Sequence, residues 1–308
     1  MSWTDKFDPA LLKMVKEVDT QIAPQLAAID ARILENQDKV LTSFQKHHVA
    51  ESYLTGSTGY GHNDEGRDVL EEIYADVLGG EDALVRPQLV SGTHAIGVAL
   101  LGLVRPGDEI LYITGKPYDT LQEVLGLAGN GIGSPKEYGI GVDYVDLLPD
   151  GAVDNEAVKS RLNAKTKVVA IQRSRGYATR DSFTVDQIAA MIKVVRSVLP
   201  NVWIFVDNAY GEFSETKEPL EVGADVMAGS LFKNAGGGMA KTGGYIVGKQ
   251  DLIERISYRF TVPGLGGAEG ATVGALADMY QGFFISPQTT GNAIKGAFLK
   301  QLCLPSLA

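Results

Sequence analysis

The sequence predicts an α/β protein with a mostly parallel, doubly wound sheet that follows a helical N-terminal arm. Short runs rich in Val and Ile have the length of strands, at residues 83–90, 109–113, 142–146, 167–172, 202–206, 224–229 and 243–248. Helical stretches separate many of them, at 93–104, 119–129, 154–162 and 184–199. Alternating strands and helices with short connections favour a parallel sheet that carries helices on both faces.

The segments on either side of this core follow other patterns. Apolar residues recur at helical spacing over 8–50, which predicts a long helix packed on a partner subunit or on its own domain. A Gly-rich loop at 55–67 and a helix over 68–78 come next. After Gly248 we expect a helix over 250–258, a Gly-rich loop and a helix through Tyr280. We therefore predict a helical arm (1–52), a large α/β domain (53–250) and a linker that begins a smaller C-terminal domain (251–308).

Charge and cysteine content exclude several classes of protein. The 308 residues include 28 Lys and Arg against 38 Asp and Glu, a net charge of −10 that argues against binding to nucleic acid. The single cysteine, Cys303, excludes an intrachain disulfide and fits a reducing compartment. The chain has no signal-peptide core, no run of about 18 apolar residues and no histidine spacing typical of a metal site. We expect a cytoplasmic protein without a metal or a membrane partner.

Lys233 is the first candidate for chemistry. It follows a buried strand and precedes a Gly-rich turn in the segment GSLFKNAGGGMAKTGG, residues 229–244. A lysine in a partly desolvated pocket has a lowered pKa and can form a Schiff base with an aldehyde. The Ser230 hydroxyl could donate to a phosphate, and the glycines at 236–238 allow a bulky cofactor to approach the backbone. A surface lysine in a flexible loop is the alternative, and this setting argues against it.

Other candidate side chains follow strands at the same edge of the predicted sheet. Asp207 ends the strand VWIFV, where a carboxylate can pair with a protonated pyridine nitrogen or simply cap a turn. Ser91, Gly92 and Thr93 stand between a strand and a helix, a turn that binds anions through backbone N–H groups. Tyr118 follows the strand EILYI and can stack against a ring. A phosphate turn, a stacking aromatic ring, a pyridine-pairing carboxylate and a lysine together indicate a site for pyridoxal 5′-phosphate (PLP).

Four segments carry a resemblance to a known family: STGYGHNDEGRDVLEEIYADVLGGEDALVRPQLVSGTHAI (57–96), IQRSRGY (171–177), SLFKNAGGGMAKTGGYIVG (230–248) and YRFTVPGLGGAEGAT (258–272). They resemble the aluminium-resistance proteins, relatives of methionine γ-lyase and the cystathionine lyases among fold-type I PLP-dependent enzymes. The resemblance implies a transferase-like α/β fold with PLP as cofactor. It implies Lys233 as the Schiff-base lysine, Asp207 as the pyridine partner and Tyr118 as the stacking ring. It further implies that Gly92, Thr93 and Ser230 bind the phosphate.

The same resemblance extends to residues outside this cradle. In the γ-lyase relatives a tyrosine of an N-terminal loop reaches the phosphate of the neighbouring subunit, and Tyr60 matches it, with Arg67 as a weaker candidate. This implies a homodimer or homotetramer. Arg173 and Arg175 are candidates to bind a substrate carboxylate or phosphate, although surface salt bridges would also explain them. Family members continue beyond residue 308, so we expect a truncated chain with an incomplete C-terminal domain.

The function implied is that of a lyase that cleaves a carbon–sulfur bond in a small amino acid. Two alternatives stay open at this point. The same lysine and aspartate serve aminotransferases, and the truncated end would also suit a non-catalytic PLP-binding protein linked to metal tolerance.

Overall fold

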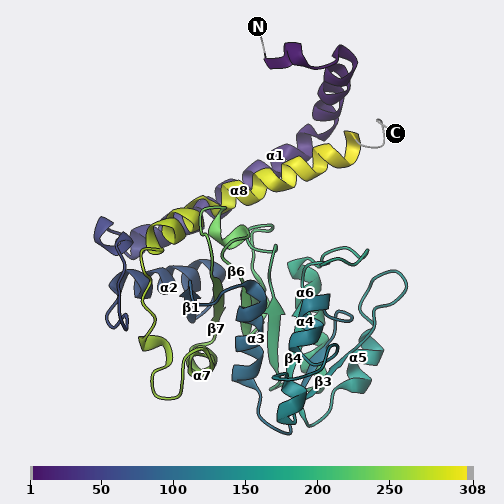
Figure 1. Cartoon of the computed structure of the whole chain (residues 1–308). Coiled ribbons are helices and arrows are strands. Elements are labelled where there is room, and N and C mark those ends of the chain that lie inside the picture. Colours follow the sequence, from purple (N-terminus) through teal and green to yellow (C-terminus); the bar gives the residue numbers. More distant parts are fainter. Residues whose placement is uncertain (1–2, 304–308) are drawn as a thin grey trace.

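The computed structural model describes residues 3–303 and contains a seven-stranded sheet of order β1-β7-β6-β5-β4-β2-β3 (Figure 1). The strands are β1 (Asp82–Arg86), β2 (Glu109–Tyr112), β3 (Gly141–Tyr144), β4 (Thr166–Gln172), β5 (Trp203–Asp207), β6 (Val226–Ser230) and β7 (Gly244–Gly248). β7 runs antiparallel to both of its neighbours, and the pairs from β6 through β3 are parallel. The prediction of a mostly parallel sheet is therefore confirmed.

Helices cover both faces of the sheet. On one face lie α3 (Gly92–Leu103), α4 (Asp119–Val124) and α7 (Gln250–Phe260), and on the other α2 (Glu65–Leu78), α5 (Asn155–Arg161) and α6 (Val185–Val198). Successive strand residues point to opposite faces, so Phe205 packs in the α3 core and Val206 in the α6 core. Short 3-10 turns complete the described chain at Trp3–Lys6, Glu51–Leu54, Pro135–Tyr138, Pro219–Val222, Asn234–Gly236 and Gly266–Ala268.

Two long helices form an arm that projects from this body (Figure 1). α1 (Pro9–Lys46) and α8 (Leu276–Cys303) lie side by side and run in opposite directions. Ile29 and Ile33 of α1 are buried, and a Cβ added at Gly291 of α8 would overlap Ile33. The expectation of a helix ending near Tyr280 was wrong. Pro287 reads as a helix breaker in isolation, but packing on α1 carries α8 through it.

Two glycine-rich loops lie against each other beside α2. The Gly270 N–H donates to the carbonyl oxygen of Tyr60 at 2.9 Å, and the Val273 N–H donates to that of Ser57 at 3.0 Å. The guanidinium of Arg67, 2% exposed, donates to the Gly61 carbonyl oxygen at 2.7 Å. These contacts join the loop that carries Tyr60 to the loop at residues 270–273.

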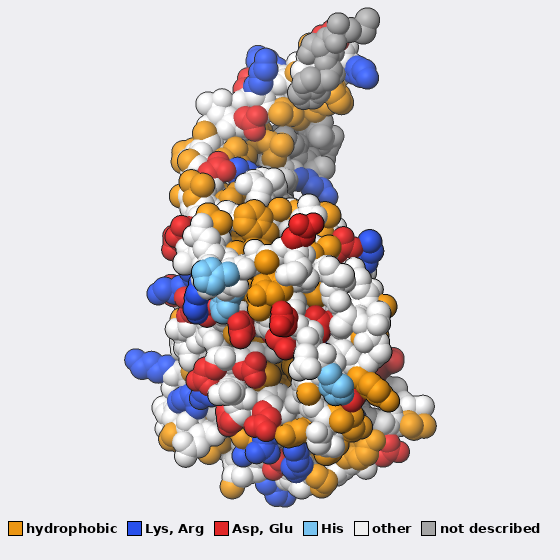
Figure 2. All heavy atoms as spheres, turned by 90° about the vertical axis from the view of Figure 1, so that its left-hand side faces the viewer, with side chains coloured by type: hydrophobic (Ala, Val, Ile, Leu, Met, Phe, Trp, Pro, Cys, Tyr) orange, Lys and Arg blue, Asp and Glu red, His pale blue; other side chains and the backbone are white. Residues whose placement is uncertain are grey.

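The face on the α2 side of the body carries a group of acidic side chains near its middle (Figure 2), in keeping with the net charge of −10. Within residues 3–303, no helix combines the length and apolar character needed to cross a membrane.

α7 packs on α3 within the body, whereas α8 packs on α1. The division of the chain into an arm and two domains stays a prediction.

Candidate active site

A hollow of about 340 Å³ opens at the carboxyl edge of the parallel strands. It collects residues that follow β1, β2, β4, β5 and β6: Ser91, Gly92, Thr93, Ile96, Tyr118, Asp119, Thr120, Ser174, Gly176, Tyr177, Asp207, Ala209, Tyr210, Phe232 and Lys233. Six of the site residues predicted from the sequence therefore meet in one place. Ligands of open α/β sheets bind at this edge, because the loops after parallel strands converge there.

The N-terminus of α3 forms one end of the hollow. The Ser91 hydroxyl caps the helix by accepting from the His94 N–H at 3.1 Å. A Cβ added at Gly92 would lie 3.2 Å from the Ser230 Cβ, so glycine allows these two segments to approach closely. The Ser230 hydroxyl is fully buried and has no hydrogen-bond partner among the described residues. A buried hydroxyl without a partner is costly, and together with the free N–H groups of α3 it makes this end suitable for an anion.

Asp207 lies at the end of β5 and is 2% exposed. Burial raises the pKa of its carboxyl to about 6, and the Ala209 N–H, which donates to Oδ1 at 3.2 Å, and the nearby charge of Lys233 oppose that rise. The buried hydroxyl of Tyr112 also has no partner among the described residues, and burial and the charge of Asp207 raise its pKa. A cation placed against Asp207 would favour its ionised form.

Lys233 follows β6, and its Nζ lies 3.9 Å from the centre of the Tyr210 ring. Tyr210 has a φ of +70°, a strained backbone conformation for a residue with a bulky side chain. The Asn234 side chain donates to the carbonyl oxygens of Tyr210 at 3.1 Å and of Glu212 at 3.2 Å, which ties the lysine loop to the turn after β5. Tyr210 was not predicted as a site residue from the sequence. Its position, three residues after Asp207 at the end of a strand, could have indicated it.

Glu212 lies beneath this turn and is fully buried. Its Oε1 accepts from the Tyr245 hydroxyl at 2.7 Å, and its Oε2 has no partner among the described residues. Burial raises the pKa of Glu212 to about 8, and the Tyr245 hydrogen bond and the charge of Arg173 only partly oppose this. The carboxyl is therefore neutral at neutral pH, and no sequence motif marked it.

Glu212→Gln should flatten the pH dependence of stability. Between the ordinary carboxyl pKa of 4.5 and the folded value of about 8, the folded state binds more protons than the unfolded state. The wild type should therefore lose up to about 1.4 kcal/mol of stability per pH unit as the pH rises through this window. Glutamine is neutral in both states and should remove this slope. Denaturant unfolding from pH 5 to 8 measures it, with the 84% exposed Glu156→Gln as control. An unchanged slope would contradict the assignment of a neutral buried carboxyl.

Besides the buried Ser230 and Arg67, the hollow leaves out the predicted residues Tyr60, Arg173 and Arg175. Tyr60 is 73% exposed on its loop and stacks on His62 with 5.7 Å between the ring centres. The guanidinium of Arg173 is buried among Glu215 at 2.7 Å, the Asn208 side chain at 2.8 Å and Glu218 at 3.4 Å. Arg175 lines an adjoining hollow instead.

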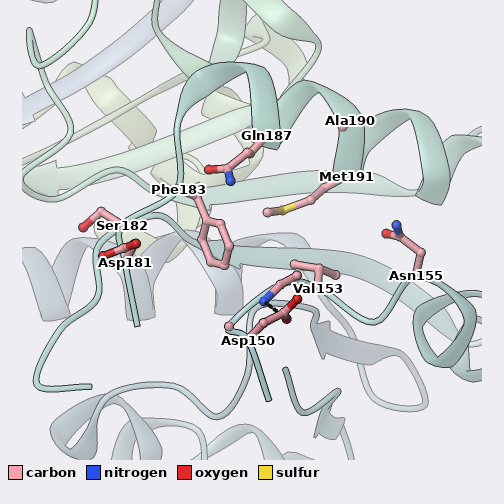
Figure 3. Close-up of a pocket in the computed structure, with 11 residues that line it drawn as sticks. Asp150, Val153, Asn155, Asp181, Ser182, Phe183, Gln187, Ala190 and Met191 are labelled. Atoms are coloured by element: carbon pink, nitrogen blue, oxygen red, sulfur yellow. Dashed lines mark hydrogen bonds between the residues drawn. The ribbon is translucent and has the colours of Figure 1, made fainter. Parts of the chain in front are cut away.

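Another hollow, of about 310 Å³, lies between α5 and α6 (Figure 3). Phe183 and Met191 point into it, and the Asp150 carboxylate accepts from the Ala152 N–H at 3.0 Å. None of the predicted site residues lines it. Across residues 3–303, no group of three or more His, Cys, Asp or Glu side chains is arranged to hold a metal ion.

Comparison with known proteins supports these assignments of fold. YnbB of Bacillus subtilis (strain 168) is 54% identical over 288 residues, which cover 93% of this chain and 68% of YnbB. A Listeria monocytogenes structure, provisionally named a cystathionine beta-lyase involved in aluminum resistance, is 51% identical with a TM-score of 0.95, over 96% of this chain and 73% of that one. A carbon–sulfur lyase involved in aluminum resistance from Clostridium novyi NT is 43% identical with a TM-score of 0.94, over 98% and 73%.

The solved neighbours have the fold-type I architecture of PLP-dependent enzymes, which confirms the fold class expected from the sequence. The family model for methionine gamma-lyase matches residues 11–308. Because this match spans almost the whole sequence, and the described part has the expected fold with a hollow at the expected sheet edge, the chain belongs to the methionine gamma-lyase family.

Proposed function

We propose that this protein is a PLP-dependent carbon–sulfur lyase that acts on a small sulfur-containing amino acid in the cytoplasm. Membership of the methionine gamma-lyase family implies PLP as the cofactor. The observation that carries the proposal is the meeting of an amine, a buried carboxylate and an anion-binding helix end in one hollow. These three groups match the aldehyde, the ring nitrogen and the phosphate of PLP.

The residues present fit the cofactor at each of its ends. The unpartnered Ser230 hydroxyl and the N-terminus of α3, with Gly92 and Thr93, suit a phosphate. Asp207, whose carboxyl is buried and whose pKa is raised, suits a protonated ring nitrogen. The Tyr118 ring lines the same hollow, and its hydroxyl lies 2.9 Å from the Thr93 hydroxyl, a contact that fixes the orientation of the ring.

When bound, PLP supplies an electron sink for the electron pair left at the substrate Cα. Lys233 would hold the cofactor through Nζ, and the same nitrogen is placed to accept the proton from Cα. The Tyr210 ring lies against one side of this nitrogen. Asp207 would keep the ring nitrogen protonated, because a buried carboxylate is stabilised by an adjacent cation.

We also propose a homodimer or homotetramer in which Tyr60 reaches the phosphate site of a neighbouring subunit. Its 73% exposure and its absence from the lining of the hollow in its own chain support this role. The buried Arg67 supports it indirectly, because it fixes the loop that presents Tyr60. Arg173 would serve as a buried support for the turn after β5 rather than as a substrate ligand.

Product analysis of the purified protein with PLP tests the reaction. Release of a keto acid together with a thiol from a sulfur amino acid supports the lyase. Transfer of the amino group to a keto-acid acceptor, without thiol release, would favour an aminotransferase. A protein that holds PLP and does neither would overturn both enzymatic proposals and favour a binding role.

A further inference from the structure

A further hollow, which we call the annex, adjoins the candidate active site. It has a volume of about 330 Å³ and lies over the ends of β2 and β4. Its lining consists of Lys116, Pro117, Tyr118, Asp119, Gln122, Gln172, Arg175, Tyr177, Ala178 and Arg180. Tyr118, Asp119 and Tyr177 line both hollows. A ligand held at Lys233 could therefore extend past Tyr118 into the annex.

The annex is lined by cationic side chains, and those of Lys116 and Arg175 form no ion pair within the described part of the chain. Arg180 has a structural role, because it donates to the carbonyl oxygens of Gln172 and Ser174 at 2.9 and 2.6 Å and stacks on Phe183. Lys116 and Arg175, by contrast, have no carboxylate within ion-pair distance among residues 3–303. Asp119 is the only carboxylate among the residues that line the annex. In a chain of net charge −10, two cations without acidic partners beside the active site point to an anionic ligand.

The wall of the annex is held in place before any ligand binds. The Gln172 side chain accepts from the Tyr118 N–H at 3.1 Å and donates to the Ser174 carbonyl oxygen at 3.0 Å. Gly176 has a φ of +56°, and a Cβ there would lie 3.2 Å from the Gln172 Nε2 and 3.4 Å from the Tyr118 Cβ. A larger residue would be strained at this position, and glycine lets the loop that carries Arg175 lie directly against Tyr118.

We propose that Lys116 and Arg175 bind a carboxylate on the side chain of the substrate, so that the preferred substrates are amino acids with an acidic side chain. The inference rests on the proposed function, because the substrate amino group must reach the PLP held by Lys233. An arginine fork and a lysine both suit a carboxylate, and together with Arg180 they outnumber Asp119, the one carboxylate at the boundary. The annex would act on substrate choice rather than on the chemical step.

The test compares two ligands of the same shape, S-carboxymethyl-L-cysteine and its neutral amide S-carbamoylmethyl-L-cysteine. Stopped-flow absorbance of the PLP-loaded protein gives the dissociation constant of each. The wild type should bind the acid about tenfold more tightly than the amide, a preference typical of a charge-assisted contact. Lys116→Ala/Arg175→Ala should remove the preference and leave the affinity for the amide unchanged. Lys193→Ala/Arg259→Ala removes the same two charges from exposed positions on α6 and α7 and should keep it.

The remaining outcomes separate the possible failures. Equal affinity of the wild type for the two ligands would overturn the inference. An equal loss of affinity for both ligands in Lys116→Ala/Arg175→Ala would place the cations on the α-carboxylate and would also overturn it. If neither ligand changes the absorbance of the wild type, the proposed function itself fails, and the inference fails with it.

Discussion

Lys233→Ala should abolish the visible absorbance of the PLP-loaded protein and lower its rate of thiol release by at least about a thousandfold. The reason is that one nitrogen has two tasks, holding the cofactor covalently and accepting the Cα proton, and alanine can do neither. Absorbance spectroscopy checks the first loss, and a thiol assay checks the second. Lys233 forms no ion pair with a carboxylate among residues 3–303, so its replacement should leave the fold intact, as circular dichroism would verify.

Lys241→Ala is the matched control for this variant. Lys241 belongs to the same Gly-rich segment, but its side chain is 84% exposed and pairs with Asp278 at 2.8 Å. Its removal should leave the absorbance and the rate unchanged. A Lys233→Ala protein that keeps the wild-type spectrum would refute covalent attachment at this residue.

Asp207→Asn should weaken PLP binding and lower kcat/KM by about a hundredfold to a thousandfold. Asparagine keeps the shape of the side chain and removes the charge that holds the ring nitrogen protonated, and loss of one partner of a buried ion pair costs about 3–5 kcal/mol. Equilibrium dialysis gives the affinity for the cofactor, and initial rates give kcat/KM. Asp181→Asn, which removes an exposed carboxylate outside the candidate site, serves as control. An affinity within twofold of the wild-type value would contradict the pairing.

The pH dependence of cofactor binding follows from the same carboxyl. Because the pKa of Asp207 is raised to about 6, the carboxylate is lost as the pH falls through 6. The affinity of the wild type for PLP should therefore fall below about pH 6, and Asp207→Asn should lack this dependence. Dialysis at pH 5, 6 and 7 would measure the difference.

Local sequence patterns were enough to predict the sheet edge that carries the candidate site. All seven apolar runs form strands, because strands that are buried on both faces of a sheet appear in the sequence as short continuous runs of apolar residues. Lys233, Asp207, Tyr118 and the Ser91–Thr93 turn each follow a strand that points the same way, so their convergence followed from the topology of a parallel sheet.

The tertiary structure decided what depends on contacts between distant segments. Arg173 and Arg175 look alike in the sequence, yet one is buried in an ion-pair network and the other lines the annex. Glu212 was invisible because its pKa depends on burial beneath a turn and on Tyr245, 33 residues away. α8 continues past Tyr280, the end expected from the sequence, because it packs along the apolar surface of α1. Periodicity records the backbone geometry of each segment, whereas burial, charge pairing and helix length at these positions depend on which remote segment packs against them.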